Sequence, residues 1–195
     1  MLTIDLVRHM KAKNRRKWTA RQDERPLSKL GLRQAAFHAD TMLQGETIAA
    51  IYSSPAIRCQ TTIGPVAERL GIEIQIEPLL AETEGYLEPA GWAGWNFGMD
   101  REDSGNPMGP AFWTGRGLAF VEKMHAVHPE GGRIVACSHG DTIPLIVTSL
   151  AGMYGIEPPR PLMGVGGFGG WYRIRFEGEP MTIQTVEPPK GFADL

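Results

Sequence analysis

An arginine and a histidine stand side by side at the end of the first apolar run of the chain. Residues 2–10 read Leu-Thr-Ile-Asp-Leu-Val-Arg-His-Met, so the pair is Arg8 and His9. Histidine can act as a nucleophile, a general base or a metal ligand, and arginine offers a planar fork of donors that suits a phosphate or a carboxylate. The bare pair is equally compatible with two solvated residues at a strand end, so its meaning depends on the rest of the chain.

A second histidine follows a second apolar run. Residues 134–141 read Ile-Val-Ala-Cys-Ser-His-Gly-Asp, and a helical pattern over residues 142–154 comes next. Ligands of an open α/β sheet bind beyond the carboxyl ends of its strands. Two strands that each deliver a histidine to that edge therefore predict His9 and His139 in one pocket.

A third segment adds an anion-binding group. Residues 51–62 read Ile-Tyr-Ser-Ser-Pro-Ala-Ile-Arg-Cys-Gln-Thr-Thr, which predicts a strand, a helix start at Ser-Ser-Pro and Arg58 in the first helical turn. Serine is a good helix cap, proline is tolerated in the first turn, and unpaired amides with a positive dipole gather there. We therefore predict an anion site that is reinforced by an arginine.

Together the three segments resemble the histidine phosphatase superfamily, also called phosphoglycerate mutase-like. The marks of that family stand here, in family order, as Arg8-His9, Ser53-Ser54-Pro55…Arg58…Gln60-Thr61 and Ser138-His139-Gly140. The resemblance covers residues 2 to about 151. Met10 departs from the family pattern, which has glycine or alanine there, so we expect a more crowded backbone after His9 with activity retained.

The order of elements predicts an α/β fold, and the resemblance implies the same one: a three-layer α/β/α sandwich with a mostly parallel central sheet. One domain is expected over residues 1–195, with a Gly/Pro/Trp-rich loop insertion at about 85–117. The last residues, 187–195, are polar and are expected to fray. The other expected elements are a helix capped by Ser28, strand 49–53, helix 57–70 closed by Gly71, strand 72–77, helix 118–127, and strands 171–176 and 181–186.

The resemblance also implies a mechanism. His9 would attack phosphorus and form a phosphohistidine that water then opens, while Arg8, Arg58 and His139 surround the phosphoryl oxygens. No metal and no cofactor is required, because guanidinium groups supply the positive charge. His9 must then be neutral, and an arginine ~4 Å away at an effective dielectric of ~20 disfavours the imidazolium by ~4 kcal/mol, or about three pKa units.

A glutamate in the loop after the third strand is the expected proton donor. Mutase-type members of the family carry this acid in a Leu-x-Glu context, which aligns with Glu82. Glu84 is the rival, because the usual spacing to the next glycine is one residue longer than Glu82 to Gly85 gives. An ordinary acidic loop is the third interpretation.

Basic residues are concentrated near the start of the chain. Half of the 20 lysines and arginines lie within residues 8–33, although the whole chain has a formal charge of −2. Such an excess attracts anions, and the substrate-binding candidates are Lys11, Lys13 and Arg25. Taken individually, residues 15–17 are interpreted as solvated. The stretch has no nucleic-acid-binding motif, so the expected partner is a phosphorylated small molecule or a phosphohistidine protein, not nucleic acid.

Composition limits the expected cellular location and the state of the cysteines. The chain has 195 residues, 42% of them hydrophobic, and no apolar run approaches the ~20 residues that span a bilayer. Because the chain begins with a strand pattern rather than a signal segment, we expect a cytoplasmic protein and no membrane partner. Cys59 and Cys137 fit neither a disulfide framework nor a zinc site and are interpreted as reduced, buried thiols.

Within the superfamily, the pattern Arg-His-x-Lys-Ala…Arg-Pro-Leu-Ser is similar to small phosphatases of the SixA type, which act on phosphohistidine proteins. It is also similar to phosphatase domains joined to nucleotide-hydrolysing modules. SixA-type members often lack the loop glutamate, so Glu82 leaves a phosphorylated metabolite or nucleotide open as substrate. The sequence predicts a phosphatase for a phosphomonoester or phosphoramidate. The alternatives are a mutase, which usually has Gly-Glu-Ser where this chain has Met10-Lys11-Ala12, and a non-catalytic module that binds phosphorylated ligands.

Overall fold

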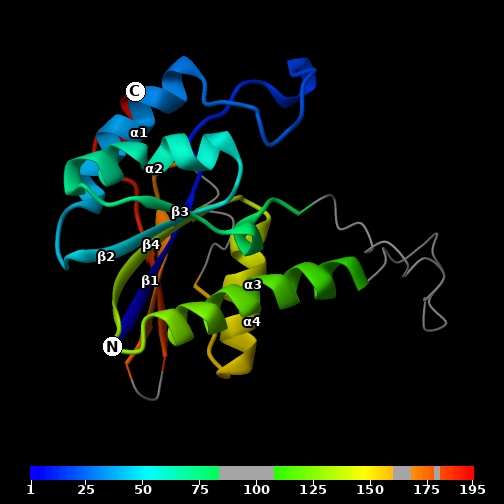
Figure 1. Cartoon of the computed structure of the whole chain (residues 1–195), viewed down its shortest axis with the longest axis vertical. Helices are drawn as coiled ribbons and strands as arrows, with labels where there is room; N and C mark the ends of the chain where they lie inside the picture. The colour runs from blue at the N-terminus through cyan, green and yellow to red at the C-terminus, as the bar shows by residue number, and fades with distance from the viewer. Residues whose placement is uncertain (84–107, 160–167, 178–180) are drawn as a thin grey trace.

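The computed structural model describes residues 1–83, 108–159, 168–177 and 181–195, and it places a six-stranded sheet at the centre (Figure 1). The strand order is β3-β2-β4-β1-β5-β6. Strands β1 to β4 pair in parallel, whereas β5 is antiparallel to both β1 and β6. The strands are β1 (Leu2–Arg8), β2 (Ile48–Ser53), β3 (Ile74–Ile76), β4 (Gly132–Ser138), β5 (Trp171–Phe176) and β6 (Thr182–Val186).

Helices cover both faces of this sheet and complete the three layers that the sequence predicted (Figure 1). Helices α1 (Lys29–Met42) and α2 (Ile57–Leu70) pack on one face, and α3 (Met108–Val127) and α4 (Thr142–Met153) pack on the other. Three short 3-10 helices complete the described chain: η1 (Arg15–Lys17), η2 (Pro78–Leu80) and η3 (Phe192–Asp194). The mostly parallel α/β fold is thereby confirmed.

Strand β1 shows why its sequence is apolar almost throughout. Ile4 and Leu6 face the core beneath α3 and α4, whereas Val7 faces the core beneath α1 and α2. Alternate residues of a strand point to opposite faces, so a strand covered on both sides is buried along its whole length. This burial fixes the register of β1 and, with it, the position of the residues that follow.

Two helix boundaries were predicted by their caps, and one start was not. The Ser28 hydroxyl accepts a hydrogen bond from Gly31 N at 3.1 Å, and Gly71 ends α2 with a φ of 65°. The N-cap of α2 is Ala56, which has no side-chain cap bond. The hydroxyl of Ser54, expected near this start as a cap, accepts a hydrogen bond from Ala56 N at 3.3 Å and also contacts a histidine, as described below.

The C-terminal tail does not fray. Phe192 is 5% exposed and packs against Phe37 of α1, and Arg33 Nη2 donates to Leu195 O at 2.7 Å. Gly169, with a φ of 90°, lies so close that an added Cβ would be 2.7 Å from the Phe192 ring. The prediction from polarity was wrong because one aromatic ring is enough to anchor the tail.

Helix α3 begins ten residues before the predicted 118, at Met108. Gly117, which suggested a loop, lies inside this helix, and its missing side chain lets α4 approach closely: a Cβ there would be 2.4 Å from Ile146 Cγ1. Residues 108–117 of the expected loop insertion are thus helical. Its remaining residues, including Trp92, Trp95 and Phe97, and the rival acid Glu84 lie outside the described residues. Strand β3 is also shorter than the predicted 72–77.

Candidate active site

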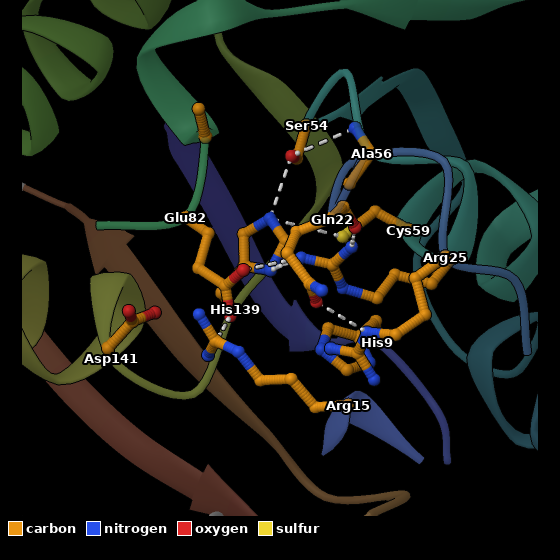
Figure 2. Close-up of polar contacts among 12 residues, drawn as sticks. His9, Arg15, Gln22, Arg25, Ser54, Ala56, Cys59, Glu82, His139 and Asp141 are labelled. Atoms are coloured by element: carbon orange, nitrogen blue, oxygen red, sulfur yellow. Dashed lines mark hydrogen bonds and ion pairs between the residues drawn. The ribbon is translucent and has the colours of Figure 1, made fainter. Parts of the chain in front are cut away.

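Strands β1 and β4 are neighbours, and a histidine follows each at the carboxyl end (Figure 2). The rings of His9 and His139 have centroids 5.4 Å apart, so the sheet edge brings the two imidazoles side by side; His9 lines one cavity and His139 lines a second one. His9 is 7% exposed and His139 is fully buried. Arg58 projects from the first turn of α2 beside them and is 1% exposed.

The proton of His9 is located by one hydrogen bond. Nδ1 of His9 is 2.8 Å from Met10 O. A carbonyl oxygen only accepts, so Nδ1 must carry the proton and Nε2 keeps its lone pair. Met10 in turn is held by a bond from its N–H to Thr62 Oγ1 at 2.9 Å, and its side chain is fully buried against Leu27. The crowding expected at Met10 is therefore accommodated in the core.

His9 is neutral at physiological pH. Its pKa is lowered from 6.5 to about 3, first by burial and then by Arg58, Arg8 and Arg25, while the bond to the Met10 backbone opposes the shift. Sequence reasoning predicted a neutral His9 but attributed it to neighbouring arginines. The larger cause is desolvation, which disfavours any charged imidazole in a buried position.

The second histidine is held at both nitrogens. Arg58 Nη2 donates to His139 Nδ1 at 3.2 Å, so a neutral ring carries its proton on Nε2, which lies 2.8 Å from Ser54 Oγ. Cys59 Sγ lies 3.6 Å from the same Nε2. Burial, followed by Arg58, lowers the pKa of His139 well below its usual value. In the free protein, His139 therefore donates to Ser54 and accepts from Arg58.

Glu82 lies between two guanidinium groups (Figure 2). Its Oε2 is 2.7 Å from Arg58 Nη2, and its Oε1 is 3.6 Å from Arg15 Nη1. The loop that carries it is fixed to the start of α4, because Thr142 Oγ1 donates to Ala81 O at 3.0 Å. The hydroxyl of Thr83 contacts Asp141 in the same region. Glu82 is thus 22% exposed but firmly positioned.

Arg8 lines the same cavity as His9 and Glu82. Its guanidinium carbon lies 4.9 Å from the centre of the Phe168 ring, and burial lowers its pKa. A Cβ on Gly140 would be 2.9 Å from this guanidinium. The glycine after His139 therefore leaves the space that the arginine fills.

Of the predicted substrate-binding residues, two line the site and one does not. Lys11 and Arg25 line a cavity of about 470 Å³ together with Arg8 and His9. Lys13 does not line this cavity. Its ammonium group lies 5.7 Å from the centre of the Trp18 ring, and its backbone carbonyl accepts a hydrogen bond from Arg25 at 2.8 Å. Lys13 therefore supports Arg25 through its backbone.

Three residues that line the candidate site were not predicted as site residues from the sequence: Arg15, Gln22 and Ser54. A second cavity of about 800 Å³ adjoins the first, and the two share Arg15 and Glu82 as lining residues. Gln22 and Ser54 also line the second cavity, and Gln22 O accepts from Arg58 Nη1 at 2.6 Å. The signals available were the basic run for Arg15 and the Ser-Ser-Pro motif for Ser54, whereas a backbone carbonyl such as that of Gln22 leaves no trace in a sequence.

The sequence profile of the histidine phosphatase superfamily (branch 1) matches residues 4–187. The chain belongs to this superfamily. The resemblance drawn from the three motifs is therefore confirmed. Over 81 residues the chain is 40% identical to an 8-oxo-(d)GTP phosphatase of Mycolicibacterium smegmatis; this region covers 41% of the chain but only 24% of that larger protein.

Solved structures share the fold. A mycobacterial glucosyl-3-phosphoglycerate phosphatase in complex with inorganic phosphate is 18% identical, with a TM-score of 0.65 over 96% of this chain and 97% of that one. The phosphoserine phosphatase of Entamoeba histolytica is 21% identical, with a TM-score of 0.62 over 94% and 95%. The α-ribazole phosphatase of Shigella flexneri is 18% identical, with a TM-score of 0.62 over 95% and 96%.

The part of the chain that the structure describes contains no helix long and apolar enough to cross a membrane.

Proposed function

We propose that the protein is a phosphatase that hydrolyses a phosphomonoester or phosphoramidate through a phosphohistidine on His9. The observation that carries the proposal is the orientation of His9. Its Nδ1 proton is bound to Met10 O at 2.8 Å, and its pKa of about 3 keeps the ring neutral. The Nε2 lone pair is thereby available at a pocket lined by Arg8 and Arg25.

The reaction proceeds in two displacements. His9 Nε2 forms a bond to phosphorus as the bond from phosphorus to the leaving oxygen or nitrogen breaks. Water then attacks the phosphohistidine, the phosphorus–nitrogen bond breaks, and inorganic phosphate leaves with His9 regenerated. Covalent catalysis of this kind replaces one difficult step by two easier ones.

Positive charge around the pocket stabilises the transferring group. Phosphoryl transfer depends mainly on positioning and on neutralising the equatorial oxygens. Arg8 and Arg58 supply fixed guanidinium donors there, and a bound dianion favours protonation of His139 at Nδ1. His139 then donates to a phosphoryl oxygen from Nδ1 while Ser54 holds its Nε2 proton at 2.8 Å.

Glu82 is the proposed proton donor. Its ion pair with Arg58, at 2.7 Å, keeps the carboxylate beside the pocket in the free enzyme. When the phosphoryl group binds Arg58 in its place, the nearby dianion favours the protonated carboxyl, because two negative charges repel. Glu82 can then protonate a leaving alkoxide and afterwards accept a proton from the attacking water.

The superfamily relatives support hydrolysis over isomerisation. The structures above are named phosphatases, and one of them holds inorganic phosphate. The substrate we propose is a phosphorylated small molecule; a nucleotide is one class to test, given the partial match to an 8-oxo-(d)GTP phosphatase. A cytoplasmic location remains a prediction.

The test is a comparison of phosphate release with a mutase-coupled assay on a set of phosphorylated metabolites, nucleotides and phosphohistidine peptides. Phosphate release with a protein-bound phosphoryl group that is stable in alkali and labile in acid is the expected result, since that stability is typical of phosphohistidine. Efficient isomerisation with negligible phosphate release would overturn the proposal in favour of a mutase. Ligand binding without turnover would favour a binding module.

A further inference from the structure

The basic loop, residues 11–25, is held by two hydrogen bonds within the loop and one from Arg58. Arg25 donates from Nη1 to Lys13 O at 2.8 Å and from Nε to Gln22 Oε1 at 3.1 Å. Arg58 Nη1 donates to Gln22 O at 2.6 Å. Because Arg25 and Arg58 are themselves buried, these bonds fix the path of the basic loop over the pocket.

Arg15 projects from this loop toward the proposed proton donor. Asn14 caps the short helix η1 by accepting from Arg16 N at 2.9 Å, which orients the turn. Arg15 extends across the pocket, and its Nη1 is 3.6 Å from Glu82 Oε1 (Figure 2). Its side chain is 62% exposed and lines both cavities. An exposed ion pair of this length is weak, so a ligand can replace Glu82 as the partner of Arg15 at little cost.

The charges of the described lining residues exceed what one phosphate requires. The two cavities are lined by six cationic side chains and three carboxylates, the cations being Arg8, Lys11, Arg15, Arg21, Arg25 and Arg58. Arg21 is paired with Asp23 at 2.5 Å. Once Glu82 and His139 are both protonated, as the proposed function requires, a phosphate dianion leaves about three positive charges unmatched. A substrate with a further negative group matches this surplus.

We propose that Arg15 binds a second anionic group of the substrate, a carboxylate or a phosphate, located on the leaving-group side of the scissile bond. The proposal rests on the proposed function, which places the leaving oxygen at Glu82. Because Arg15 faces the other oxygen of Glu82, its guanidinium lies beside the proposed position of the leaving group, at the edge of the cavity that His9 also lines. The substrate class is therefore a phosphate ester whose alcohol portion is itself acidic.

The test compares substrates that differ only in this charge. O-Phospholactate is paired with O-phospholactamide, and propane-1,3-diol bisphosphate with 3-hydroxypropyl phosphate, all at one salt concentration. The wild type is expected to prefer the more acidic member of at least one pair. The Arg15→Gln variant should lose that preference, with kcat/KM for the acidic member falling about tenfold or more, as expected when a charged hydrogen-bond partner is removed.

Arg16→Gln is the matched control. Arg16 is the next residue of η1, is exposed and lines neither cavity, so its loss should change each pair equally and slightly. An equal loss on both members of each pair for Arg15→Gln would show that Arg15 acts through Glu82 and would overturn the proposal. A preserved preference in Arg15→Gln would overturn it as well. The pair that responds identifies the second group as carboxylate or phosphate.

Binding separates this inference from the proposed function. Calorimetric titration of the same four compounds into His9→Ala, with and without Arg15→Gln, measures the preference without turnover. Tighter binding of the acidic member that disappears with Arg15 supports the second-anion site even if no compound is hydrolysed. Equal binding of both members overturns the site even if hydrolysis is fast.

Discussion

Two carboxylates in this protein each lie between two arginines, and they differ in what surrounds them. Asp5 of β1 binds Arg133 at 2.9 Å and Arg173 at 2.7 Å, with Asp5 fully buried and Arg133 1% exposed. Arg133 also donates to Met42 O at 2.9 Å and to two further carbonyls beyond the end of α1. Glu82 binds Arg58 and Arg15 at the wall of two cavities.

This difference indicates that the Asp5 cluster is structural, whereas the arginines of the Glu82 cluster can exchange the carboxylate for another anion. The Asp5 cluster joins β1, β4 and β5 to the end of α1, and the cavities described above do not reach it. The Glu82 cluster has one short and one long contact, and both its arginines line open space, so a phosphate can compete for them. The same residue types therefore stabilise the fold in one place and line the proposed substrate site in the other, according to burial and access.

The largest effect is expected from removing His9, the proposed nucleophile. His9→Ala should abolish turnover, because no neighbouring group can replace Nε2. Arg58→Ala and His139→Ala should each reduce kcat by about 10²–10³-fold and leave residual activity, since they stabilise charge that other donors partly neutralise. Single-turnover kinetics on one substrate measures all three, with exposed His125→Gln as the control. Undiminished turnover by His9→Ala would exclude the covalent mechanism.

Substitutions in the Asp5 cluster should change the stability of the fold rather than the activity. Asp5→Asn leaves two arginines facing no charge and should lower the free energy of unfolding by about 3–5 kcal/mol. Glu82→Gln, at a partly exposed pair, should lower it by at most about 1 kcal/mol. Urea unfolding of both variants and the wild type at one pH gives the comparison. A similar loss in the two variants would mean that access to solvent does not distinguish the clusters.

Much of this site is readable from the sequence because it follows strand ends. Arg8, His9 and His139 lie at the ends of two nearly continuous apolar runs, and such runs are typical of strands that are buried on both faces. Arg15 was interpreted as solvated, and it is mostly exposed, yet it reaches the pocket because Gln22 and Lys13 bind buried arginines through their carbonyls.

The same limitation applies to Ser54 and to the tail. A serine before a helix predicts a hydrogen bond to the helix start, which Ser54 accepts from Ala56 N at 3.3 Å, but its shorter contact with His139 Nε2 at 2.8 Å was not predicted. Phe192 and Leu195 are separated apolar residues in a mostly polar tail, so no strand or helix periodicity marks them. Contacts between segments distant in sequence decide both cases, and a local pattern cannot report them.

The role of Glu82 is tested by changing the leaving group. Glu82→Gln should reduce activity toward alkyl phosphates by about a hundredfold or more, because their alkoxides leave badly without a proton. p-Nitrophenyl phosphate, whose phenolate needs little help, should lose much less. Glu84→Gln is the paired variant and should be mild on both substrates. Selective loss on alkyl phosphates in Glu84→Gln alone would transfer the role to Glu84, and no selectivity in either variant would favour substrates with good leaving groups.

The pH dependence of the free energy of unfolding should reflect the low pKa of buried His9. The pKa of His9 is about 3 in the folded protein against 6.5 in a free side chain, so below pH ~6.5 only the unfolded state takes up this proton. The contribution of His9 to the free energy of unfolding is therefore fully present above pH ~6.5 and is lost as the pH falls toward 3, which amounts to about 2 kcal/mol by about pH 5.

His9→Gln removes the titrating group. Its loss of stability between about pH 7.5 and about pH 5, from urea unfolding, should thus be smaller than that of the wild type by about 2 kcal/mol. His38, buried in the closed core with a pKa of about 4, stays unchanged and continues to make both proteins acid-sensitive. An identical pH dependence in the two proteins would mean that His9 is already protonated in the folded state near pH 5, and a neutral nucleophile would then have to be excluded under those conditions.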